Sequence, residues 1–136
     1  MNSRDNQRDP ASFRVLIVDD HSDTRDVLME LLSLEGHQVM TADSGESGLA
    51  RLFSEGFDVA VIDIALPNMD GFEVARRARE NLRDATPFLV AISGIAPPAG
   101  GAPLPFDEYC VKPFDPDRFL AILSSASAVR PGSQKS

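Results

Sequence analysis

Residues Val59–Pro67 read VAVIDIALP, and the pair Asp70-Gly71 follows. A continuous apolar run of this length is typical of a β-strand buried on both faces, as in a parallel sheet covered by helices. Asp63 is the single charged residue in the run and comes where we expect the strand to end. Because ligands of open α/β folds bind beside the carboxyl ends of the strands, we predict that Asp63 is a functional carboxylate.

The overall composition is typical of one soluble globular domain, with 136 residues, 43% hydrophobic and 25% charged. We expect a flexible leader over residues 1–12, the domain over 13–128 and a disordered tail over 129–136, because both ends are polar and lack periodicity. No apolar run reaches membrane-spanning length, so we expect a cytoplasmic protein without membrane contact. The net charge of -8 argues against a nucleic-acid partner, because binding phosphates requires clustered lysine and arginine. The single cysteine, Cys110, excludes an internal disulfide and is expected to be buried.

Strand-like and helix-like segments alternate along the chain. Apolar runs predict strands over 13–18, 38–42, 59–63, 88–92 and 109–111. Helices are expected after Ser22, after the turn 43–45, after Asp70, and after Asp115 or Asp117. We expect Val27 in the buried stripe of the first helix and Phe53 in that of the second. Such alternation predicts a parallel sheet with right-handed crossovers and helices on both faces.

The segment 94–108 breaks this alternation. It holds four prolines and three glycines among fifteen residues. In a helix each interior proline costs about 3 kcal/mol and each glycine about 1 kcal/mol. We therefore predict an extended or polyproline-like loop where a fourth helix would be expected.

Polar side chains follow the ends of four predicted strands: Asp19, Asp20, Asp63, Ser93 and Lys112. Because all strands of a parallel sheet run the same way, these residues should meet at one edge. Three carboxylates crowded together repel one another unless a cation compensates. Hard oxygen ligands favour Mg²⁺. Asp63 is then the candidate nucleophile that forms an aspartyl phosphate, with Lys112 and Ser93 suited to phosphoryl oxygens.

Neither a thiolate nor a histidine cluster is evident for softer metals. His21 and His37 are both expected in solvent-facing loops, without ligand spacing to each other or to Cys110. The sequence therefore predicts Mg²⁺ rather than zinc.

A set of motifs, taken in their order along the chain, resembles the receiver domain of two-component response regulators. It consists of Asp19-Asp20, Asp63 with Pro67 and Asp70-Gly71, Ser93-Gly94, Tyr109, and Lys112-Pro113. The resemblance implies a flavodoxin-like, CheY-like doubly wound sheet of five parallel strands in the order 2-1-3-4-5. The loop 94–108 departs from the family by removing or distorting its fourth helix, which typically takes part in output.

The resemblance also implies roles for individual residues. Asp63 would be the phosphoacceptor, and the metal ligands would be Asp19, Asp20, Asp63 and the backbone carbonyl of Ala65. Ser93 and Lys112 would contact the phosphoryl group, and Ser93 and Tyr109 would form the switch. The peptide bond between Lys112 and Pro113 would be cis.

The function implied is a phosphorelay module rather than an enzyme. It would take a phosphoryl group from a phosphohistidine on a sensor histidine kinase or a histidine phosphotransfer protein, and signal to an unknown downstream protein as a monomer or weak dimer. Two alternatives stay open: a pseudo-receiver scaffold that is never phosphorylated, and a phosphohydrolase with an aspartyl nucleophile. Against the hydrolase, Ala65 stands where a second acid is usually required, and 136 residues leave no room for a cap domain.

Overall fold

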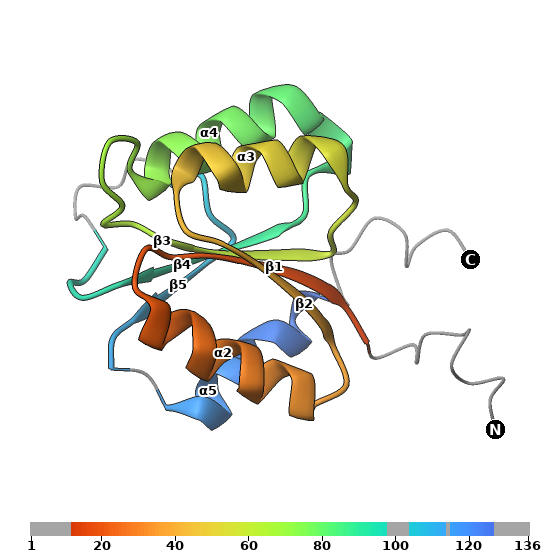
Figure 1. The fold of residues 1–136 in the computed structure, drawn as a ribbon, viewed down its shortest axis with the longest axis vertical. Helices are drawn as coiled ribbons and strands as arrows, with labels where there is room; N and C mark the ends of the chain where they lie inside the picture. Colours follow the sequence, from red (N-terminus) through yellow and green to blue (C-terminus); the bar gives the residue numbers. More distant parts are fainter. Residues whose placement is uncertain (1–11, 98–103, 114, 127–136) are drawn as a thin grey trace, which may run out of the picture.

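The computed structural model describes residues 12–97, 104–113 and 115–126. A five-stranded parallel sheet with strand order β2-β1-β3-β4-β5 forms its centre. Helices α3 and α4 cover one face, and α2 and α5 cover the other (Figure 1). The strands are β1 (Arg14–Val18), β2 (Gln38–Ala42), β3 (Val59–Asp63), β4 (Phe88–Ser93) and β5 (Glu108–Val111). The helices are α2 (Ser22–Leu34), α3 (Gly45–Ser54), α4 (Gly71–Leu82) and α5 (Pro116–Ser124), with a short 3-10 turn η1 (Arg83–Ala85) after α4. The predicted fold and strand order are confirmed.

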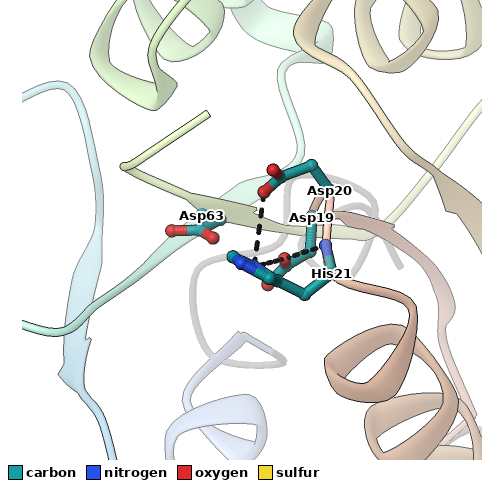
Figure 2. Close-up of side chains that lie close together, drawn as sticks. All are labelled: Asp19, Asp20, His21 and Asp63. Carbon is teal, nitrogen blue, oxygen red and sulfur yellow. Dashed lines mark hydrogen bonds and ion pairs between the residues drawn. The ribbon is translucent and has the colours of Figure 1, made fainter. Parts of the chain in front are cut away.

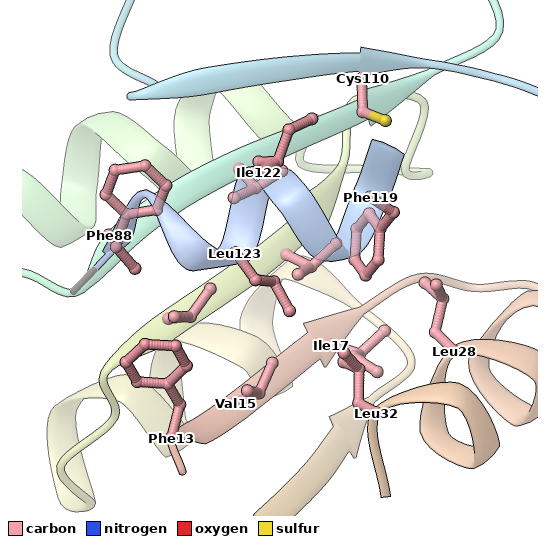
Figure 3. Close-up of a cluster of buried hydrophobic side chains, with 14 of the residues drawn as sticks. Phe13, Val15, Ile17, Leu28, Leu32, Phe88, Cys110, Phe119, Ile122 and Leu123 are labelled. Atoms are coloured by element: carbon pink, nitrogen blue, oxygen red, sulfur yellow. The ribbon is translucent and has the colours of Figure 1, made fainter. Parts of the chain in front are cut away.

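Strands β3 and β4 are buried along their whole length, as the apolar run around Asp63 predicted. Successive side chains of a strand point to opposite faces, so the sheet separates two apolar cores. Val15, Ile17, Val59 and Val61 belong to the core under α2 and α5 (Figure 3). Leu16, Val18, Ala60 and Ile62 belong to the core under α3 and α4. Cys110, the single cysteine, is buried in the first core.

Two apolar residues expected in helix cores are exposed. Val27 is 62% exposed and Phe53 48% exposed. In α2 the buried positions are Leu28 and Leu32, one helical turn apart, and Val27 precedes this stripe on the solvent side. In α3 the buried leucines are Leu49 and Leu52, and Phe53 is not among the buried residues of the helix. Both predictions were wrong because the buried stripe of each helix is narrower than the apolar pattern indicated.

Side chains cap three of the helices. The Asp70 carboxylate accepts a hydrogen bond from Glu73 N at 3.0 Å and caps α4 as predicted. Asp115, rather than Asp117, caps α5. Ser44 and Ser47 form a capping box at α3. The predicted cap of α2 was wrong, because Ser22 is the first helical residue and His21 takes the cap position without a side-chain hydrogen bond.

The segment between β4 and β5 contains no helix over the residues described there, 94–97 and 104–107; positions 98–103 of the predicted loop lie outside the described residues. Arg79 of α4 holds the second part, donating to Pro105 O at 2.7 Å and to Asp107 Oδ2 at 3.1 Å. Asp107 Oδ2 also accepts from Leu89 N at 2.8 Å. An arginine and an aspartate thus fasten this segment to α4 and β4.

Most of the predicted leader and tail, residues 1–11 and 127–136, also lies outside the described residues. Ser12 is described: it is buried and donates to Gly36 O at 2.9 Å. The ordered part of the domain therefore includes Ser12, which we had expected in the leader.

Candidate functional site

The site lies at the carboxyl edge of the sheet. Asp63 ends β3 and stands opposite Ile92 of β4 in the strand register. Asp19 and Asp20 directly follow β1, which pairs with the other side of β3. Lys112 directly follows β5. The parallel topology brings all of these strand ends to one edge, as the sequence predicted.

One lysine joins the two buried carboxylates. Lys112 Nζ lies 3.7 Å from Asp19 Oδ2 and 3.7 Å from Asp63 Oδ2. The side chain of Asp19 is 0% exposed and that of Asp63 only 2%. Asp20 is more accessible, with a side chain 31% exposed, and lies beside His21 (Figure 2). The predicted convergence of acids from β1 and β3 with the lysine after β5 is confirmed.

Backbone groups hold one oxygen of each buried carboxylate. Asp19 Oδ1 accepts a hydrogen bond from His21 N at 2.9 Å, and Asp63 Oδ1 accepts one from Ala65 N at 3.0 Å. The Arg25 guanidinium donates to the Asp19 backbone carbonyl at 2.9 Å. Each side chain therefore keeps a fixed orientation, with its Oδ2 directed toward Lys112.

The close approach of α4 to the end of β3 explains why position 71 is a glycine. A Cβ atom at Gly71 would lie 2.5 Å from the Asp63 carbonyl oxygen and 2.8 Å from Ile64 Cα. Gly71 N donates to Ile64 O at 3.0 Å. The start of α4 thus packs directly against the backbone of Asp63, and only glycine allows this approach.

Burial raises the pKa of the Asp63 carboxyl above its ordinary value of 3.8. The negative charge of Asp19 raises this pKa further, while the Ala65 N–H and the Lys112 ammonium oppose the rise. A buried carboxylate next to another one is costly to ionise unless a cation lies nearby. The site therefore favours additional positive charge.

Two buried oxygens point to a cation. Asp19 Oδ2 and Asp63 Oδ2 have no hydrogen-bond partner among the described residues. Lys112 supplies one positive charge against the three carboxylates of Asp19, Asp20 and Asp63. Carboxylate oxygens are the ligands that divalent hard cations prefer. The residues present thus fit the magnesium ion that the sequence predicted.

His21 belongs to this cluster, and sequence reasoning missed it. Its Nδ1 lies 3.2 Å from Asp19 Oδ1 and 3.4 Å from Asp20 Oδ1. One ligand atom from each of Asp19, Asp20, His21 and Asp63 falls within 4.8 Å of the others (Figure 2). The His21 side chain is 63% exposed, so it does face solvent as expected. Its position directly after two aspartates was the available signal.

His37, by contrast, is not solvent-facing, and that prediction was wrong. It is half-buried, stacks on Phe13 with ring centroids 5.3 Å apart, and its Nδ1 accepts from Phe13 N at 3.0 Å. Burial lowers the pKa of its imidazole, against a smaller opposite effect of Glu35. His37 therefore has a structural role away from the site.

A family model described as the response regulator receiver domain matches residues 15–124. The chain belongs to the response regulator receiver domain family. A probable transcriptional regulator, ycf27, from Guillardia theta is 38% identical over 108 residues, which are 79% of this chain and 42% of that protein. The receiver domain described here thus spans about half the length of the curated relatives it matches.

Solved structures of receiver domains have the same fold. The response regulator TrrA from Thermotoga maritima, in complex with Mg²⁺-BeF, is similar with a TM-score of 0.76 and 31% identity, covering 83% of this chain and 97% of that one. A structure of the histidine kinase ThkA in complex with TrrA is similar with a TM-score of 0.75, 31% identity and the same coverage. This chain is therefore a receiver domain of the two-component type, and one of its structural relatives, TrrA, has been seen bound to a histidine kinase.

The other residues predicted for the receiver site occupy the same edge. Ser93 is buried at the end of β4, and its Oγ accepts from Ile95 N at 3.1 Å. Lys112 N donates to Ser93 O at 2.6 Å, which joins the ends of β4 and β5. Tyr109 lies in β5, is half-buried and pairs with Ala91 of β4. The peptide bond between Lys112 and Pro113 is cis, as the resemblance implied.

No helix among the described parts of this receiver domain combines the length and the apolar character needed to cross a bilayer.

Proposed function

We propose that this receiver domain accepts a phosphoryl group on Asp63 from a phosphohistidine, carried by a sensor histidine kinase or a histidine phosphotransfer protein. The observation that carries the proposal is that Asp63 Oδ2 is buried and has no hydrogen-bond partner among the described residues. This oxygen also lies 3.7 Å from the Lys112 ammonium. It is thus the free oxygen of an otherwise fixed carboxylate.

The transfer breaks the phosphorus–nitrogen bond of the donor and forms a bond between phosphorus and Asp63 Oδ2. Asp63 Oδ1 keeps its hydrogen bond to Ala65 N, which orients the nucleophile. The Lys112 ammonium then balances charge on the phosphoryl oxygens. Mg²⁺, for which Asp19, Asp20, Asp63 and the backbone carbonyl of Ala65 are the proposed ligands, would supply further charge neutralisation when bound.

Ser93 and Tyr109 are the proposed switch. In the described state the Ser93 hydroxyl accepts from Ile95 N, so it is available to turn toward a phosphoryl oxygen and donate. That turn would release the Ile95 amide and reorder the loop after β4. Tyr109, half-buried on the neighbouring strand, would then move inward.

Output is proposed to pass through binding to another protein rather than through an enzymatic activity of this domain. The net charge of -8 argues against nucleic-acid binding by these residues. Domain bounds of 13–128, a cytoplasmic location and a monomeric or weakly dimeric state stay predictions.

Intact-mass measurement after incubation with acetyl phosphate and Mg²⁺ tests the proposal. The wild-type chain should gain the mass of one phosphoryl group, and Asp63→Asn should gain none. Asp84→Asn, an exposed aspartate of η1, is the matched control and should behave as wild type. Absence of any mass gain in the wild type would support the scaffold alternative, and continued turnover of acetyl phosphate at many equivalents would support the hydrolase.

A further inference from the structure

A small cavity lies at the carboxyl end of the edge strand β2, where residues of α2 and α3 meet. Its volume is about 260 Å³, and its lining consists of Arg25, Thr41, Ala42, Asp43, Ser47 and Arg51. Every one of these residues except Ala42 has a polar side chain. None of them belongs to the cluster of Asp19, Asp20, Asp63 and Lys112, so this cavity, here called the β2 cavity, is separate from the acidic site.

Two half-buried arginines from different helices line the β2 cavity. Arg25 donates to the backbone carbonyl of Asp19 at 2.9 Å and forms no ion pair among the described residues. Because a carbonyl is neutral, the charge of Arg25 is not compensated there. Arg51 Nη1 donates to Glu55 Oε2 at 2.8 Å, but Arg14 Nη2 also lies 3.2 Å from Glu55 Oε1. One carboxylate thus serves two arginines.

Charge and hydrogen-bond donors in the β2 cavity suit a small anion. With the exposed Asp43 included, three arginines face two carboxylates, which leaves an excess of positive charge in a chain whose net charge is -8. Each guanidinium carries five N–H donors in a planar fork that matches oxyanions. Ser47 and Arg51 lie one turn apart on the same side of α3, and Thr41 adds a hydroxyl. The cavity is smaller than the sites of about 300 to 1,000 Å³ that hold drug-sized molecules.

The lining of the β2 cavity also holds the main chain of Asp19 on both sides. Asp19 N donates to Ala42 O at 3.1 Å, and Asp19 O accepts from the Arg25 guanidinium at 2.9 Å. A ligand that binds Arg25 therefore changes the surroundings of the Asp19 peptide groups. The side chain of the same residue reaches into the acidic site, where its Oδ2 lies 3.7 Å from Lys112 Nζ.

We propose that the β2 cavity binds a small oxyanion of the phosphate or sulfate class between Arg25 and Arg51, and that the Asp19 backbone responds to its binding. Guanidinium groups bind such anions through paired, charge-assisted hydrogen bonds. Arg25 uses one terminal nitrogen in its described contact, and so does Arg51, which leaves the other terminal nitrogen and Nε of each for the anion. This inference does not depend on phosphorylation of Asp63.

Amide NMR of the full chain, titrated with sodium sulfate without Mg²⁺ and at constant ionic strength, tests the proposal. Sulfate is the probe because it cannot phosphorylate Asp63. The amide signals of Thr41, Asp43 and Ser47 should shift until saturation, with a dissociation constant of about 1 to 10 mM, because contacts of partly exposed arginines are weak. The Asp19 amide should shift with the same dissociation constant. Sodium chloride alone should give no saturating shift.

Three variants separate the β2 cavity from the general charge of the chain. Arg51→Gln should weaken sulfate binding at least about fivefold, because it removes charge-assisted donors. The variant should still fold, since the ion pair with Glu55 that it loses lies at the surface. Asp43→Asn should strengthen sulfate binding about twofold, because it removes the negative charge of the lining. Arg77→Gln, a change of the same charge on α4, is the control and should alter the affinity less than about twofold.

Several results would overturn the proposal. Sulfate binding that is lost in Lys112→Gln but kept in Arg51→Gln would place the anion beside Asp63 instead. Equal weakening in Arg51→Gln and Arg77→Gln would show an effect of net charge alone. An Asp19 amide that does not respond while the cavity amides shift would refute the link to the acidic site. If acetyl phosphate gives no mass gain but sulfate binding depends on Arg51, the proposed function fails and the anion site stands.

Discussion

Replacing Gly71 by alanine should both destabilise the domain and displace the acceptor carboxylate. The added Cβ would meet the Asp63 carbonyl oxygen at 2.5 Å, Ile64 Cα at 2.8 Å and the Asp63 carbonyl carbon at 3.0 Å. All three are backbone atoms of a buried strand end, so they cannot move aside as a flexible side chain can. Relief requires the start of α4 to retreat from β3 or the Asp63 backbone to shift.

The expected cost follows from these contacts. Forcing extra methyl groups into a packed region costs about 1 to 3 kcal/mol. The entropic advantage of alanine over glycine in the unfolded chain offsets only about 0.4 to 1 kcal/mol of this. We therefore expect Gly71→Ala to lower the free energy of unfolding by about 1 to 2 kcal/mol. A displacement of the nucleophile by about 1 Å can slow a reaction by about a hundredfold, so phosphorylation should slow by a larger factor than the stability loss alone would cause.

Urea unfolding and the initial rate of mass gain from acetyl phosphate measure the two effects. Gly56→Ala is the matched control, because a Cβ at Gly56 meets no atom within 4 Å. The control should be as stable as the wild type or slightly more stable, with an unchanged rate. If Gly71→Ala unfolds at the wild-type urea concentration and is phosphorylated at the wild-type rate, then close packing of α4 on Asp63 does not position the acceptor.

Three further changes test the charges and the loop. Asp63→Asn should stabilise the metal-free protein at neutral pH. Burial raises the pKa of the Asp63 carboxyl, so the stability that this carboxyl contributes is complete below about pH 4 and is lost as pH rises through the pKa of the folded state. Urea unfolding of both proteins in EDTA at several pH values measures the difference. Lys112→Gln should slow phosphorylation by about a hundredfold, as measured by mass gain, because a charge near the transferred group is lost. The same variant should bind Mg²⁺ more tightly in calorimetry, because the competing ammonium is gone. Arg79→Ala should cost about 1 to 2 kcal/mol in urea unfolding, because it removes the hydrogen bonds to Pro105 and Asp107, and should speed hydrogen exchange over 104–107.

Each of these has an outcome that contradicts it. A stability difference between Asp63→Asn and wild type that does not grow between pH 4 and pH 7 would show that burial of this charge is not costly. Weaker Mg²⁺ binding in Lys112→Gln would mean that the lysine does not compete for the carboxylates. Arg76→Ala is the control for Arg79, since Arg76 contacts only Glu73 of its own helix in the described contacts; equal exchange rates in the two variants would remove the role assigned to Arg79.

The strand ends could be predicted because their signal is local. Each apolar run stops at a polar residue, and parallel topology then requires Asp63, Asp20 and Lys112 to share an edge. The position of the His21 ring could not be predicted, because it depends on how the loop after β1 turns into α2. The hydrogen bond from Arg79 to Pro105 O could not be predicted either, because it joins residues that are 26 positions apart with no periodic pattern between them. Val27 and Phe53 were misplaced because each is adjacent to a buried residue, Leu28 or Leu52, and the apolar pattern alone does not show how wide the buried stripe of a helix is.

The buried Cys110 makes this domain convenient for site-specific labelling. Burial raises the pKa of its thiol and keeps it from solvent, so it should react slowly with maleimide reagents. A cysteine introduced at Ile95, which is exposed and whose amide is held by Ser93, would be the fast-reacting position in an otherwise unaltered chain. A fluorophore attached to the Ile95→Cys variant would report in real time on the loop beside Asp63, and Cys110 would not have to be removed from the core.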